Sequence, residues 1–142
     1  MGTSTSEHTG SVRRVDHVAI EVADFDERIE LLTGALGMRV QRLGTLFSDP
    51  SRRVAMVGDG AGFKLELIEA DVRSPVAGDH LAHVAFLTDD VDAGWQALVA
   101  AGLESTAPPR DFEPALSRTA TCAHPGGTAI QLVNYAEASL DR

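Results

Sequence analysis

The sequence predicts an α+β fold in which two βαβββ modules form one cupped, mixed sheet with helices on the outside. The first observation is an internal repeat, because His17 and His83 open similar apolar segments at an offset of 66 residues. The second is that each half begins with a short apolar run rich in β-branched residues, which is typical of a strand. The third is that a helix signal and three further strand signals follow in both halves.

The repeat extends through both halves. At an offset of 65 residues, Arg53 meets Arg118, and the segment Lys64–Ile68 meets Ala129–Val133. We therefore expect one domain over residues 13–136, built from modules 13–70 and 80–136 that are joined by a linker at 71–79. Residues 1–12 are expected to form a flexible tail and residues 137–142 a C-terminal tail.

In the first half, the apolar run Val15–Val22 predicts the opening strand. Asp24, with Glu27 three residues later, has the spacing of a helix cap, and Gly37 ends the apolar face of that helix. Three strands follow, which we expect near residues 38–46, 53–57 and 63–69.

The second half repeats this plan. Leu81–Leu87 predicts the opening strand, either Asp89 or Asp90 caps the helix, and Gly102 ends it. The three strands that follow are expected near residues 103–107, 118–123 and 128–134.

Composition excludes several classes of function. The chain has 142 residues, with 12 Lys and Arg against 21 Asp and Glu, so its formal net charge of -9 repels nucleic acid. No apolar run approaches the roughly 20 residues that cross a bilayer, and residues 1–10 do not resemble a signal peptide. The single cysteine, Cys122, forms no internal disulfide and provides no cysteine metal cluster. We expect a cytoplasmic protein with no membrane or nucleic-acid partner.

Four polar residues occupy matched places in the repeat: His17 and His83 on the opening strands, Glu66 and Gln131 on the last strands. Because side chains alternate along a strand, all four point away from neighbours that pack under the helices. A single histidine on a strand is more often a structural residue, but four matched positions make one shared site an equal alternative. Two imidazoles, a carboxylate and an amide oxygen suit a divalent ion such as Zn, Ni, Co, Mn or Fe.

The span from Val15 to Tyr135 resembles the vicinal oxygen chelate superfamily of glyoxalases, bleomycin-resistance proteins and extradiol dioxygenases. The resemblance rests on the segments Asp16–Ile20, Leu65–Leu67 and Ala82–Phe86, and on the turn His124–Gly127 before Ile130–Leu132. In layout the chain is most similar to methylmalonyl-CoA epimerase and glyoxalase-like proteins. This resemblance implies a glyoxalase-like cup and a homodimer, with His17, Glu66, His83 and Gln131 as metal ligands.

One departure from the family bears on the reaction. The related isomerases usually place a carboxylate on the last strand, where this chain has Gln131, and the carboxylate here is Glu66. Glu66 is therefore the expected proton-transfer base, and an exchange of roles between the two halves is one explanation of its position. Asp49 is a second candidate proton carrier, although its segment also has the composition of a plain turn. Arg53 and Arg118 are candidates for holding an anionic small-molecule substrate, with solvated surface arginines as the alternative.

The favoured function is a metal-dependent isomerase, epimerase or lyase that acts on a small carbonyl or thioester substrate through a metal-stabilised enolate. Two alternatives remain. One is a small-molecule binding protein of the antibiotic-resistance type, which the low aromatic content of 5% disfavours. The other is an Fe(II) extradiol-type dioxygenase, which Gln131 disfavours.

Overall fold

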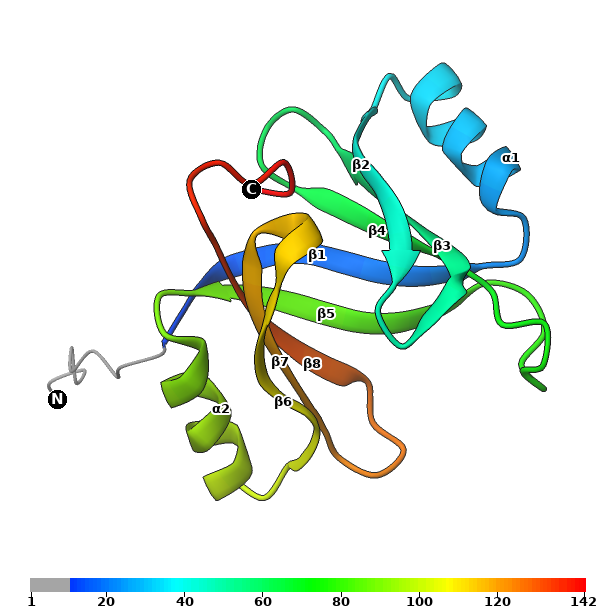
Figure 1. The fold of residues 1–142 in the computed structure, drawn as a ribbon. Coiled ribbons are helices and arrows are strands. Elements are labelled where there is room, and N and C mark those ends of the chain that lie inside the picture. The colour runs from blue at the N-terminus through cyan, green and yellow to red at the C-terminus, as the bar shows by residue number, and fades with distance from the viewer. Residues whose placement is uncertain (1–10) are drawn as a thin grey trace, which may run out of the picture.

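The computed structural model describes residues 11–142 (Figure 1). The expected tail at residues 1–12 lies outside this range except for Ser11 and Val12, and Val12 already belongs to the first strand. The first half contains β1 (Val12–Val22), α1 (Phe25–Glu30), β2 (Arg39–Leu46), β3 (Asp49–Gly58) and β4 (Lys64–Glu69). The second half contains β5 (His80–Thr88), α2 (Val91–Ala100), β6 (Glu104–Phe112), β7 (Ser117–Ala123) and β8 (Ala129–Tyr135).

The eight strands form one mixed sheet with the order β2-β3-β4-β1-β5-β8-β7-β6. Each opening strand pairs in parallel with the last strand of its own half, β1 with β4 and β5 with β8. The two halves join where β1 and β5 pair antiparallel. When β5 to β8 are matched with β1 to β4, the strand order is the same from either edge of the sheet. The predicted pair of βαβββ modules is therefore confirmed, and both halves contribute to one sheet within a single chain.

The helix of the first half begins where the sequence predicted. The Asp24 side chain accepts a hydrogen bond of 3.0 Å from the Glu27 backbone N–H, which satisfies a donor at the start of α1. A π-helical turn, Leu31–Ala35, continues α1, and Gly37 ends the segment with a φ of 68° that suits glycine.

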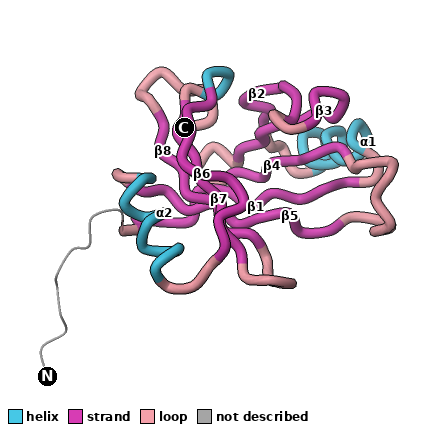
Figure 2. Tube along the Cα trace, turned by 60° about the horizontal axis from the view of Figure 1, so that its bottom comes forward, coloured by secondary structure: helices cyan, strands magenta, loops and turns pink. Residues whose placement is uncertain are grey.

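The structure settles which aspartate caps the second helix. Asp90 accepts a hydrogen bond of 3.0 Å from the Ala93 backbone N–H, whereas Asp89 lies outside the helix and pairs with Arg13. Gly102 follows α2 with a φ of 101°. Figure 2 shows the two helices at opposite ends of the sheet.

Each helix covers an apolar face of its own module. Under α1 and its π-helical turn, Phe25 and Leu32 pack with Leu67 of β4, and under α2, Val91 packs with Ala120 and Leu132. Because side chains alternate along a strand, the residues between these core positions face the other side of the sheet. Glu66 and Gln131 therefore project to the concave face, as the sequence predicted.

The structure revises one expected turn. The connection between β2 and β3 is only Phe47 and Ser48, and Asp49 is the first residue of β3, paired with Leu46.

In residues 11–142, neither helix has the length or the apolar composition needed to cross a membrane.

Candidate metal centre

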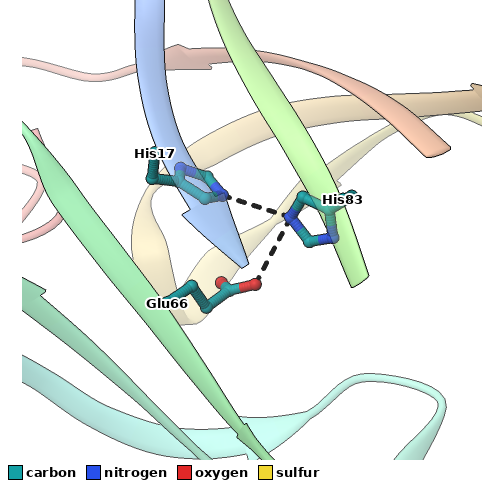
Figure 3. Close-up of side chains that lie close together, drawn as sticks. All are labelled: His17, Glu66 and His83. Atoms are coloured by element: carbon teal, nitrogen blue, oxygen red, sulfur yellow. Dashed lines mark hydrogen bonds and ion pairs between the residues drawn. The ribbon is translucent and has the colours of Figure 1, made fainter. Parts of the chain in front are cut away.

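Three of the four predicted ligands meet on the concave face (Figure 3). The Nε2 atoms of His17 and His83 lie 3.2 Å apart, and His83 Nε2 lies 3.4 Å from Glu66 Oε1. One potential ligand atom from each of the three side chains lies within 4.8 Å of the other two. Two nitrogen ligands of one tetrahedral zinc ion lie about 3.3 Å apart, given zinc–nitrogen bonds of about 2.0 Å. The spacing of these side chains therefore fits a divalent ion.

Strand register explains why the four positions converge. Ala19 of β1 pairs with both Glu66 and His83, and Ala85 of β5 pairs with both His17 and Gln131. In each of these rows of paired residues across three neighbouring strands, an alanine lies between a histidine and a residue with an oxygen donor. Both alanines have no exposed surface. Two small side chains between the donors leave space for an ion. Gln131 lines the same cavity as the other three residues.

Asp16 orients His17. The two residues are adjacent on β1, so in a regular strand they would face opposite sides. Here the pairing with β5 runs from Val15 directly to His17, which makes Asp16 the extra residue of a β-bulge. Asp16 Oδ2 lies 2.7 Å from His17 Nδ1. With Nδ1 donating to Asp16, Nε2 presents its lone pair to the cavity, as in metal sites whose histidines are held by carboxylates.

The Asp16 carboxylate is completely buried and accepts two further hydrogen bonds. Lys64 Nζ lies 2.9 Å from Oδ1, and the Tyr135 hydroxyl donates to Oδ2 at 2.6 Å. Burial alone would raise the pKa of Asp16, but the hydrogen bonds from His17, Lys64 and Tyr135 lower that pKa below its usual value. Burial and the nearby Asp16 raise the pKa of Tyr135, so its hydroxyl remains a donor. Asp16 is therefore a fixed anion behind His17.

His83 is kept neutral by its surroundings. Burial lowers the pKa of His83 to about 4, and the neighbouring His17 acts in the same direction, while Glu66 opposes the shift. A neutral imidazole has the free lone pair that a metal ligand requires.

These residues line a cavity of about 110 Å³ between the two halves. Its walls also contain Arg42 and Thr45 of β2, Val54 and Met56 of β3, and Arg110, Phe112, Ser117 and Thr119 from β6 and β7. Three of the chain's seven aromatic residues line the cavity, namely Phe47, Phe112 and Tyr135. The cavity is therefore richer in aromatic side chains than the overall composition suggested.

Residues 136–142, expected only as a tail at 137–142, help to close the cavity. Asp141 is only 2% exposed, its carboxylate accepts hydrogen bonds of 2.8 and 2.9 Å from Arg42, and its backbone carbonyl accepts one from Lys64. In Figure 1 this red segment runs from β8 to the first half of the fold. Sequence reasoning missed the role of Asp141, because nothing local indicates a contact with a residue 99 positions away.

Three other predicted site residues lie elsewhere. Arg53 pairs with Asp26 and Glu69, and Arg118 pairs with Asp92 and Asp111. Both arginines are on the helix side of the sheet, so neither is among the residues that line the cavity. Asp49 accepts hydrogen bonds from the backbone and hydroxyl of Ser51 and pairs with Arg73, also outside the cavity lining. The structure therefore does not bring Asp49, Arg53 or Arg118 together with the histidines.

Comparison with known families agrees with this geometry. Residues 14–132 match the family described as the Glyoxalase/Bleomycin resistance protein/Dioxygenase superfamily. The chain belongs to this superfamily. A search of curated proteins found no match.

Among solved structures, this chain is similar to methylmalonyl-CoA epimerases. The epimerase from Mycobacterium tuberculosis has a TM-score of 0.74 and 28% identity, covering 93% of this chain and 94% of that one. A variant of the Streptomyces coelicolor epimerase in complex with 2-nitronate-propionyl-CoA has a TM-score of 0.72 and 27% identity, covering 89% and 99%. An epimerase in complex with methylmalonyl-CoA and NH4+ has a TM-score of 0.74 and 28% identity, covering 91% and 99%.

Proposed function

We propose that this protein is a divalent-metal-dependent isomerase or epimerase that moves a proton on the carbon beside a carbonyl or thioester group. One observation carries the proposal: His17, His83 and Glu66, from three different strands, direct ligand atoms to a common point at a cavity. The similarity to methylmalonyl-CoA epimerases supports an isomerase within a superfamily that also contains binding proteins and dioxygenases.

His17, His83, Glu66 and Gln131 would hold the ion. When bound, the ion would polarise the substrate carbonyl and so acidify the neighbouring carbon. The donor set of two imidazole nitrogens and two oxygens is compatible with Zn, Ni, Co, Mn or Fe. The buried Asp16 behind His17 adds a partner that such ligand histidines typically have.

Glu66 is the proposed base. Of the two carboxylates that line the cavity within residues 11–142, Asp141 is neutralised by Arg42, whereas Glu66 has no arginine or lysine partner. Its symmetry-related counterpart, Gln131, cannot take up a proton. The proton therefore moves from the substrate carbon to a Glu66 carboxylate oxygen, while His83 remains neutral beside it.

The proposed substrate is a small carbonyl compound or an acyl thioester. Solved relatives contain methylmalonyl-CoA or 2-nitronate-propionyl-CoA, both of which place a short acyl group on coenzyme A. A cavity of about 110 Å³ suits the short acyl part, and the rest of a thioester would extend outside it.

Proton exchange in deuterium oxide tests the reaction. With methylmalonyl-CoA as probe, we expect the Co²⁺- or Zn²⁺-loaded protein to introduce deuterium at the carbon between the carboxylate and the thioester. Glu66→Gln should abolish exchange, and Asp59→Asn, in a loop away from the cavity, should not. Chelation of the metal should also stop exchange.

Other outcomes would contradict the proposal. Full exchange by the Glu66→Gln variant would exclude Glu66 as the base. Protein purified without chelator that holds no metal, and whose His17→Ala variant binds a ligand normally, would indicate a binding protein. Oxygen uptake on a catechol would instead indicate a dioxygenase. The homodimer and the cytoplasmic location remain predictions.

A further inference from the structure

One wall of the cavity combines two guanidinium groups with two phenylalanine rings. Arg110 Cζ lies 3.9 Å from the centroid of the Phe47 ring, and Arg42 Cζ lies 5.7 Å from that of Phe112. The two rings meet edge to face, with centroids 6.2 Å apart. We call these four residues the guanidinium wall. Stacking on a ring restrains a guanidinium group while leaving its N–H edge free to bind another group.

The two arginines of the wall differ in what they bind. Arg42 donates two hydrogen bonds to the Asp141 carboxylate. Arg110 Nε is buried and has no hydrogen-bond partner, and within residues 11–142 Arg110 forms no ion pair. Eight other arginines lie within 4.0 Å of a carboxylate oxygen. Among the described residues, Arg39 and Arg142 also form no ion pair, but Arg110 is the one of these three that lines the cavity.

A buried N–H without an acceptor is costly. Because Arg110 lines the cavity, a ligand there can supply acceptors to its guanidinium group. Arginine presents parallel N–H groups that match the two oxygens of a carboxylate. The Arg42–Asp141 pair shows that this cavity already accommodates one such carboxylate. Within residues 11–142, no carboxylate pairs with Arg110 in this way.

The sheet places Arg110 within a short molecule's reach of the candidate metal centre. Arg110 pairs with Thr119 of β7, and Thr119 pairs with Val133 of β8, two residues from Gln131. Val133 lies two strands away from Arg110, which places their backbones about 10 Å apart. The arginine side chain spans part of this distance. All four of these residues line the cavity.

Building on the proposed function, we propose that Arg110 binds a carboxylate of the substrate that is separate from the carbonyl group at the metal centre. The substrate class is thus a short oxo acid or acyl thioester with a free carboxylate at its far end. A carboxylate fits better than a phosphate, because one guanidinium against the Phe47 ring balances a single negative charge. This assigns to Arg110 the anion-binding role that the sequence suggested for Arg53 and Arg118.

Two small probes that differ by one carboxylate test the assignment. Calorimetric titration of the Co²⁺-loaded protein would compare 2-oxoglutarate with 2-oxobutyrate, which lacks the far carboxylate. We expect 2-oxoglutarate to bind at least tenfold more tightly, as a charge-assisted hydrogen bond provides. In Arg110→Gln this preference should fall to about one, and Arg110→Lys should restore part of it. Arg39→Gln, which changes an exposed arginine at the start of β2, should keep the full preference.

Several results would overturn the assignment: an unchanged preference in Arg110→Gln, no preference in the unaltered protein, or no measurable binding of either probe. If inorganic phosphate binds more tightly than 2-oxoglutarate, and Arg110→Gln loses phosphate binding, the site is a phosphate site instead.

Titrations without Co²⁺ separate this proposal from the metal proposal. A preference that depends on Arg110 in protein unable to bind Co²⁺ would support Arg110 and contradict the metal.

Discussion

Ala82 occupies in the second half of the chain the position that Asp16 occupies in the first, and each is the extra residue of a β-bulge directly before a site histidine. The two bulges are a structural consequence of the repeat, but only the first carries a carboxylate. His17 is therefore held by a hydrogen bond of 2.7 Å from its Nδ1 to Asp16, while the corresponding residue before His83 is an alanine.

This asymmetry predicts the effect of Asp16→Asn. The amide removes the anion that fixes His17 Nδ1 as a donor, so we expect divalent-metal affinity to fall about 10- to 100-fold, as for other partners of metal-bound histidines. Competition with a chromophoric chelator measures the affinity. Asp59→Asn, a loop substitution, is the control. Unchanged zinc affinity in a folded Asp16→Asn protein would show that Asp16 has only a structural role.

The pKa of His83 predicts how the stability of the metal-free protein depends on pH. Folding lowers this pKa from 6.5 to about 4, mainly through burial. Between these values the unfolded chain binds a proton that the folded chain does not, so the free energy of unfolding falls as the pH is lowered from 6.5 to about 4. The loss attributable to His83 is on the order of 3 kcal/mol.

Denaturant unfolding at several pH values, compared with His83→Gln, measures this contribution. The variant should lose less stability over the same interval, while His124→Asn, in the turn before β8, should behave like the unaltered protein. Parallel curves for the unaltered and His83→Gln proteins would contradict the inferred neutral, buried state of His83.

Parts of this site could be predicted from sequence because they depend on local alternation. Glu66, His83 and Gln131 lie between apolar neighbours, His17 is followed by the apolar segment Val18–Ile20, and the repeat aligned all four. The same alternation places Arg53 on the side of Ala55 and Val57, which pack under α1, so strand parity alone argues against a cavity role for Arg53. The repeat matched Arg53 with Arg118, but this match does not indicate which side of the sheet either side chain occupies.

Other parts depend on pairings that a sequence does not reveal. Asp16 reaches the Nδ1 atom of His17 only because of a bulge, which is defined by the partner strand. Asp141 reaches Arg42 through the three-dimensional course of residues 136–142. The unpaired state of Arg110 can be recognised only once the partners of the neighbouring charges are known.

The buried pair Arg42–Asp141 predicts a large cost for Asp141→Asn. The side chains are 9% and 2% exposed, and removal of one partner leaves a charge in a poorly solvated site. We expect a loss of about 3 kcal/mol in the free energy of unfolding, measured with urea. Asp89→Asn, which alters the exposed pair with Arg13, should change stability little. Equal effects of the two substitutions would show that residues 136–142 do not pack stably against the cavity.

The space between the metal-ligand candidates predicts that Ala85→Val blocks the site. Ala85 is fully buried and lies between His17 and Gln131 in one row of the sheet, so two added carbons would occupy the position of the ion. Ala120→Val is the matched control, because Ala120 is 1% exposed but packs under α2 on the other face. Both changes should destabilise the fold by about 1–3 kcal/mol through overpacking. Only Ala85→Val should lose bound Co²⁺, measured by visible absorption and metal analysis, and full Co²⁺ binding in that folded variant would place the ion elsewhere.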